Sequence, residues 1–193
     1  MSITQRVRST VYGVLHGLLL IGYPVLANAA VVTQRTPSIC YQGETSQLLC
    51  YEAPNGTPQD VKVADITYIA TYLRKYGRQN PRQPGFFTMK AADAADCAEW
   101  SLYTRGTAAA LAKHLDTTDD TSVLFEDIAT TLDGGERATD DLKAKAIIGC
   151  LTNGGSLGVL VNSSNPAYSS DTYTSSGYTT KGLLIKIVHS SES

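Results

Sequence analysis

Three residues of this chain stand in the order of a hydrolase triad. Gly154-Gly155-Ser156-Leu157-Gly158 matches the G-x-S-x-G pattern of a serine nucleophile, and Asp171 and His189 follow it in the sequence Ser, Asp, His. Such a triad would hydrolyse esters. The pattern requires a strand before the serine and a helix after it, whereas here a helix-like segment precedes Ser156 and an apolar, β-branched segment follows. A Gly-rich turn explains the same residues, so a secreted esterase-like hydrolase is the alternative hypothesis.

Carboxylates offer a second kind of chemistry, because two facing carboxyl groups can hydrolyse a glycosidic bond. Glu126 and Asp127 fall on the solvent side of a predicted helix, and Glu99 faces away from Trp100 in a predicted strand. Asp119 and Asp120 are typical of a loop or a helix cap. The sequence therefore favours a protein without a catalytic pair. It also lacks motifs for a metal, a phosphate loop or a dinucleotide, so we expect no metal and no cofactor.

The N-terminus predicts export. Residues 1–29 combine Arg6 and Arg8, an apolar stretch over 11–21 and the cleavage pattern Ala27-Asn28-Ala29, which together are typical of a signal peptide. A retained membrane anchor needs about 18 or more uninterrupted apolar residues, and Gly17 and Pro24 interrupt this one. We therefore expect a secreted, extracellular protein that has no membrane segment after cleavage.

The four cysteines predict two disulfides. Cys40, Cys50, Cys97 and Cys150 all follow the signal peptide, and an even number in an exported chain is typical of paired thiols. Spacing leaves all three connectivities open. We favour Cys40–Cys50 and Cys97–Cys150, which would staple a hairpin and tie a strand to a helical layer. A metal site is disfavoured because no Cys-x-x-Cys pair is present.

The charge balance and two sequons describe the surface. Removing the two arginines of the signal peptide leaves 14 basic residues against 18 acidic ones, a net charge of −4. This mild acidity excludes the electrostatic footprint of a nucleic-acid-binding protein. Asn162-Ser163-Ser164 and Asn55-Gly56-Thr57 are candidate glycosylation sites.

Periodicity predicts the elements that must carry these residues. A helix is expected over 60–76, with Tyr68, Tyr72 and Tyr76 forming a stripe beside its buried face. That stripe is interpreted as packing at the edge of the core, and a contact surface is its alternative. Three more helices are predicted between 107 and 149. Strands are predicted at 40–52, 86–90, 97–103, 157–161 and 182–188.

These elements predict an α+β fold, in which an antiparallel sheet of about five strands has helices packed on one face. After a flexible arm at 30–39, residues 40–190 form a single domain. Two loops are candidate contact surfaces for a protein or glycan target. The first is a basic segment and the second is rich in tyrosine, and their candidate residues are Arg74, Lys75, Arg78, Arg82, Tyr168, Tyr173 and Tyr178.

Several segments resemble small secreted effector-like proteins of filamentous fungi. They are Asp96-Cys97-Ala98-Glu99-Trp100, Leu124-Phe125-Glu126-Asp127-Ile128-Ala129, Asp133-Gly134-Gly135 and Cys150 with its Gly-rich sequel. A more distant similarity is to the α/β-sandwich folds of killer-toxin-like proteins, from which this chain departs in having only four cysteines. The resemblance implies a non-enzymatic protein that binds a host or competitor target. A cell-wall or carbohydrate-binding surface protein is a further alternative.

Overall fold

The computed structural model describes residues 44–54, 56–79, 85–94 and 98–191. All of these residues belong to one compact unit. The predicted signal peptide at 1–29 and the arm at 30–39 lie outside the described residues, as do Cys40, Cys97, Asn55 and Arg82. None of the helices in the described ranges is long and apolar enough to cross a membrane.

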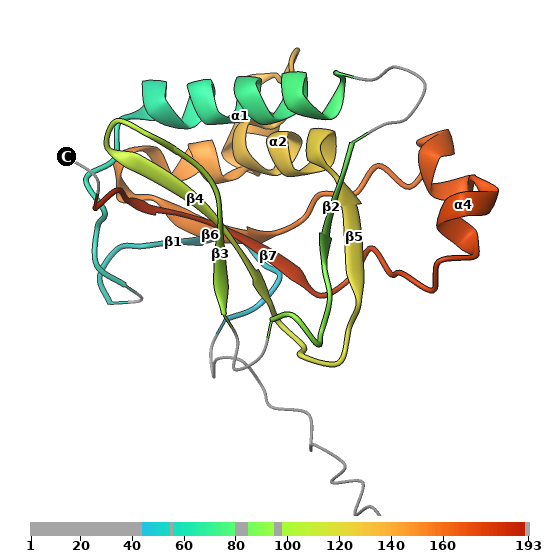
Figure 1. The fold of residues 1–193 in the computed structure, drawn as a ribbon. Coiled ribbons are helices and arrows are strands. Elements are labelled where there is room, and N and C mark those ends of the chain that lie inside the picture. Colours follow the sequence, from blue (N-terminus) through green and yellow to red (C-terminus); the bar gives the residue numbers. More distant parts are fainter. Residues whose placement is uncertain (1–43, 55, 80–84, 95–97, 192–193) are drawn as a thin grey trace, which may run out of the picture. The chain divides into compact units, whose positions relative to one another are not determined.

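The fold is built on a five-stranded antiparallel sheet with the strand order β1-β6-β7-β4-β3 (Figure 1). At its centre, β4 (Ala108–His114) pairs with β7 (Leu183–His189) along seven residues. The outer strands are β3 (Glu99–Arg105), β6 (Gly155–Gly158) and the short β1 (Leu49–Cys50). Such an antiparallel sheet was predicted, and it is confirmed.

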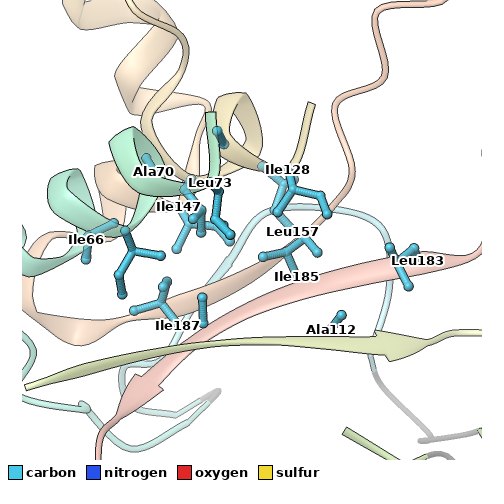
Figure 2. Packing of buried hydrophobic residues seen from close by; sticks show 14 of the residues in the cluster. Ile66, Ala70, Leu73, Ala112, Ile128, Ile147, Leu157, Leu183, Ile185 and Ile187 are labelled. Atoms are coloured by element: carbon cyan, nitrogen blue, oxygen red, sulfur yellow. The ribbon is translucent and has the colours of Figure 1, made fainter. Parts of the chain in front are cut away.

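Two helices cover one face of this sheet, α1 (Val63–Gly77) and α2 (Phe125–Asp133). Their apolar side chains meet those of the central strands in a single core, where Ile66, Leu73 and Ile128 lie against Ile185 and Ile187 (Figure 2). Each fully buried side chain of this size contributes roughly 1.5–3 kcal/mol. Alanines at alternate positions of β4 are small enough to leave room for these larger groups.

A second, two-stranded antiparallel sheet consists of β2 (Phe86–Met89) and β5 (Thr121–Leu124). The segment 86–90 is predicted as a strand of the main sheet, whereas the structure pairs β2 with β5, from which α2 continues directly. The other helical segments are α3 (Asp140–Ala144), η2 (Ile147–Asn153), η3 (Pro166–Ser169) and α4 (Asp171–Thr174).

The helix predicted from Thr107 to Leu115 is wrong, because this segment forms β4. Ala108, Ala110, Ala112 and His114 are all fully buried and alternate along the strand with less buried positions, a period of two. Alanine and leucine at helical spacing also fit a helix, so local pattern alone did not distinguish the two. Pairing with β3 on one side and β7 on the other decides for the strand.

The predicted disulfide pairing is also wrong. Cys50 is bonded to Cys150, 100 residues further along the chain, and the bond joins β1 to η2. This bond excludes both favoured pairs, Cys40–Cys50 and Cys97–Cys150. The prediction assumed that Cys150 ends a helix packed beside β3, whereas the antiparallel pairing of β1 with β6 brings Cys50 next to η2. A disulfide that closes a loop of this length stabilises a chain by about 4–5 kcal/mol in the chain-entropy model.

Candidate functional site

The structure does not bring the residues of the suspected triad together. Ser156 lies on β6 with only 1% of its surface exposed, opposite Lys186 on β7. His189 lies three residues beyond Lys186, roughly 10 Å along the strand, and its side chain projects from the other face of the sheet. The Nδ1 atom of His189 is 2.9 Å from the carbonyl oxygen of Gln59. Asp171 begins the exposed α4.

The surroundings of Ser156 form an ionic cluster on the sheet face opposite α1 and α2. The Glu44 carboxylate accepts hydrogen bonds from Lys113 Nζ at 2.6 Å and from Lys186 Nζ at 2.7 Å. Lys186 Nζ also donates to Glu99 Oε1 at 2.7 Å. All four charges therefore lie in one network, and Glu44 fastens the segment before β1 to the sheet.

Burial and hydrogen bonding shift the pKa values within this cluster in opposite directions. Burial lowers the pKa of Lys186, but its hydrogen bonds to Glu44 and Glu99 outweigh that effect and the net shift is upward. Burial raises the pKa of Glu44, and the hydrogen bonds from the two lysines reverse this, so the net shift is downward. The ion pairs with Glu44 and Glu99 therefore favour the charged form of Lys186.

The basic segment does not present the surface that the sequence predicted. Arg74 is only 5% exposed, and its guanidinium binds Asp133 in a bidentate pair, with Nη1–Oδ2 at 3.0 Å and Nη2–Oδ1 at 2.7 Å. Arg78 is exposed but is shared between Glu126 and Glu136. Lys75 is exposed. Acidic residues distant in the sequence thus neutralise both arginines, which could not be foreseen from the local charge count.

The position of Asp127 differs from the prediction, because its side chain is buried. It was expected on the solvent side of its helix, yet it is 4% exposed. Its Oδ2 atom accepts hydrogen bonds from the Tyr168 hydroxyl at 2.6 Å and from the Asn162 backbone N–H at 3.2 Å. Burial raises the pKa of Asp127 and outweighs these two bonds. Asp127 therefore holds the tyrosine-rich segment against α2.

Tyr168 is predicted as a surface contact residue, but the structure buries it, and it anchors the tyrosine-rich segment. Its hydroxyl donates to Asp127 and accepts a hydrogen bond from the Leu124 backbone N–H at 2.8 Å. Burial, with the neighbouring Asp127 charge, raises the pKa of Tyr168. The ring packs edge-on against Phe86 and Tyr173, with centroids 5.6 and 5.2 Å away. The anchor thus fixes the position of the following residues.

Tyr173 and Tyr178, the other two candidates of the segment, line a groove. It has a volume of about 520 Å³, and its lining comes from the β2–β5 sheet and from the segment that runs from η3 past α4. In the ribbon, α4 lies on the same side of the domain as β2 and β5 (Figure 1). We call it the tyrosine groove, and its lining residues are Gly85, Phe86, Thr88, Ser122, Ala167, Ser170, Thr172, Tyr173, Ser176 and Tyr178.

The lining of the tyrosine groove combines aromatic rings with hydroxyl groups and contains no charged side chain among the residues that the structure describes. Phe86 stacks on Tyr173 with ring centroids 5.2 Å apart. The Tyr173 hydroxyl donates to the Ser122 carbonyl oxygen at 2.8 Å, and the Thr88 and Ser122 hydroxyl oxygens are 2.8 Å apart. Both walls of the groove are therefore fixed to each other by hydrogen bonds.

Phe86, Thr88 and Ser122 were missed as site residues. They lie on one face of the two-stranded sheet, where Thr88 is directly opposite Ser122. A polar residue at alternate positions of an otherwise apolar strand was the available signal, because it marks the face that does not enter the core. From the sequence, the segment 86–89 is predicted only as a buried strand, without a face that lines a groove.

The tyrosine stripe on α1 forms a second aromatic surface. Tyr68 and Tyr76 are 44% and 45% exposed, and Tyr72 stacks on Tyr103 of β3 with centroids 3.9 Å apart. The Arg105 guanidinium lies 4.4 Å from the centre of the Tyr68 ring. These contacts fasten β3 to α1, which agrees with packing at the edge of the core, although the rings are more exposed than that interpretation implies.

Within the described ranges, no group of three or more His, Cys, Asp or Glu side chains could hold a metal ion. Asn162 is exposed, and glycosylation there remains a prediction. In the comparisons with known proteins, the chain matched no family model, no curated protein and no solved structure.

Proposed function

We propose that this protein is secreted and acts by binding a target outside the producing cell, in the manner of an effector or a toxin, and not by catalysis. The observation that carries the proposal is the tyrosine groove, a concavity with no charged side chain among its described lining residues. Its volume of about 520 Å³ falls within the range of roughly 300–1,000 Å³ that is usual for ligand sites.

The distribution of rigid and accessible parts supports a binding role. The disulfide, the core and the ionic cluster around Glu44 stabilise the sheet and its helices. The segment beyond Tyr168, by contrast, carries exposed polar residues on a short helix. A rigid scaffold that presents an exposed loop is the usual arrangement of a recognition surface.

The hydrolase alternative lacks comparable support. A working triad needs its histidine within hydrogen-bonding distance of the serine, about 2.6–3.2 Å. Ser156 and His189 belong to opposite faces of the sheet, and the residue paired with Ser156 across β6 and β7 is Lys186, whose ion pairs with Glu44 and Glu99 favour its charged form. Neither Ser156 nor His189 lines the tyrosine groove.

The test is binding of the purified, fluorescently labelled protein to intact plant and fungal cells. Ser176→Trp introduces a large ring into the tyrosine groove, and Ser191→Trp makes the same change at an exposed position near the C-terminus. We expect saturable binding by the wild type and by Ser191→Trp, and at least tenfold weaker binding by Ser176→Trp. Absence of saturable binding, or equal binding by a folded Ser176→Trp variant, would refute the proposal.

A further inference from the structure

We propose that the ligand of the tyrosine groove is a neutral oligosaccharide. This inference rests on the proposed function and specifies the chemical class of the target. It follows from three properties of the groove, which are its charge, the arrangement of its rings and hydroxyls, and the occupied edge of β5.

The first property is the absence of charge from the described lining. A phosphate, a sulfate or a uronic acid would lose its hydration inside the groove without gaining an ion pair, and that loss opposes binding. The tyrosine groove is lined by the aromatic side chains of Phe86, Tyr173 and Tyr178 and by serine and threonine residues. An uncharged ligand fits this lining, and a charged one does not.

The second property is the pairing of rings with hydroxyl groups. A sugar ring has an apolar face of C–H bonds and a rim of hydroxyls, so it can stack on an aromatic side chain while its rim exchanges hydrogen bonds. Among the described residues, no hydrogen-bond partner is found for the side-chain hydroxyls of Tyr178 and Thr172, and both line the groove. These two hydroxyls are available to a ligand, whereas the Tyr173 hydroxyl is engaged with Ser122.

The third property argues against an extended peptide. A peptide strand often binds by adding to an exposed sheet edge. On the side of β5 away from β2, the backbone N–H of Ser122 already donates to the Thr179 carbonyl at 2.9 Å, and Thr179 N–H donates to Asp120 at 3.0 Å. That edge of β5 is therefore occupied by the chain itself, and a peptide strand cannot add to it.

The groove is also preorganised, which favours a weakly interacting ligand. Asp127 and Tyr168 fix the start of its wall, and the Tyr173 hydroxyl fixes the wall to β5. Little conformational freedom remains to be lost on binding, so stacking and hydrogen bonds to a few sugar units translate into measurable affinity.

The experiment is isothermal titration calorimetry of the full secreted chain with chitohexaose, cellohexaose and laminarihexaose as neutral probes, and hexagalacturonate as the charged probe. We expect at least one neutral probe to bind and hexagalacturonate to bind more weakly. Tyr178→Ala, which removes a stacking ring of the groove, is expected to weaken binding about tenfold. Tyr76→Ala removes an exposed ring outside the groove and is expected to leave the affinity unchanged.

The outcomes separate this inference from the proposed function. If no neutral probe binds, or hexagalacturonate binds more tightly, while Ser176→Trp still abolishes binding to cells, the oligosaccharide inference is overturned and the binding function stands. If Ser176→Trp leaves cell binding intact, both fail. Equal effects of Tyr178→Ala and Tyr76→Ala on the affinity for a neutral probe would also overturn the assignment to this groove.

Discussion

Removing one oxygen atom, that of the Tyr168 hydroxyl, is expected to destabilise the domain well beyond a usual surface substitution. Tyr168→Phe keeps the ring that packs against Phe86 and Tyr173. It deletes the donor to the buried Asp127 carboxylate and the acceptor for the Leu124 backbone N–H. Two buried polar groups thereby lose a partner at once.

The magnitude follows from those two losses. A hydrogen bond to a charged group contributes about 1.5–3 kcal/mol, and a buried donor left without a partner costs about 1–3 kcal/mol. Asp127 keeps its bond from the Asn162 N–H, which limits the first loss. We therefore expect the free energy of unfolding to fall by about 3 kcal/mol. For a chain of this size the melting temperature should fall by about 6–12 °C.

Denaturation by urea, followed by far-UV circular dichroism, measures this loss directly. Tyr178→Phe is the matched control, because its hydroxyl has no partner in the described part of the chain, and it should change the stability by less than about 0.5 kcal/mol. A loss below about 1 kcal/mol for Tyr168→Phe, or equal losses in the two variants, would refute the role assigned to the Asp127–Tyr168 contact.

Three further predictions concern the buried charges and the disulfide. The pKa of Asp127 is raised in the folded state, so folding favours the protonated carboxyl group. The resulting contribution to the free energy of unfolding is fully present below the unfolded pKa of about 3.8 and is lost as the pH rises. The melting temperature of Asp127→Asn minus that of the wild type should therefore increase from pH 3 to pH 7. A difference that does not change with pH would contradict this. The pKa of Glu44 is lowered, so its contribution is present above about 4.5 and is lost on acidification. Because Lys186 keeps its bond to Glu99, Glu44→Gln should lower the stability by about 1.5–3 kcal/mol at pH 7 and by much less at pH 2.5, as measured by urea denaturation at both values. Replacing Cys50 and Cys150 by alanine should cost about 2–5 kcal/mol, whereas an unchanged urea midpoint would show that the bond contributes nothing.

The sequence predicted the elements whose pattern is strong. The apolar period of α1, the face of α2 that carries Ile128 and Leu132, and the final strand β7 are all confirmed. It failed where a pattern fits two structures, as in β4, whose alanines satisfy both a helix and a strand. The partner strand decides such cases, and a partner distant in the sequence is invisible to local analysis.

The candidate site shows the same limit. Tyr173 and Tyr178 were recognised by composition, but the opposite wall of the groove, with Phe86 and Ser122, comes from a separate part of the chain. Likewise, Arg74 counted as a surface charge until Asp133, 59 residues away, was found to bind it. Contacts between residues distant in the sequence form the groove and neutralise Arg74. Such contacts cannot be predicted from the local pattern of a single sequence.

The separation of the two sheets has a consequence for protein engineering. The β2–β5 sheet shares no strand with the five-stranded sheet, and α4 lies outside the main core. Residues 174–178 can therefore be randomised in a display library while the scaffold stays intact, provided that Asp127, Tyr168 and Tyr173 are retained. Selection from such a library against chosen targets would turn this domain into a source of new binders.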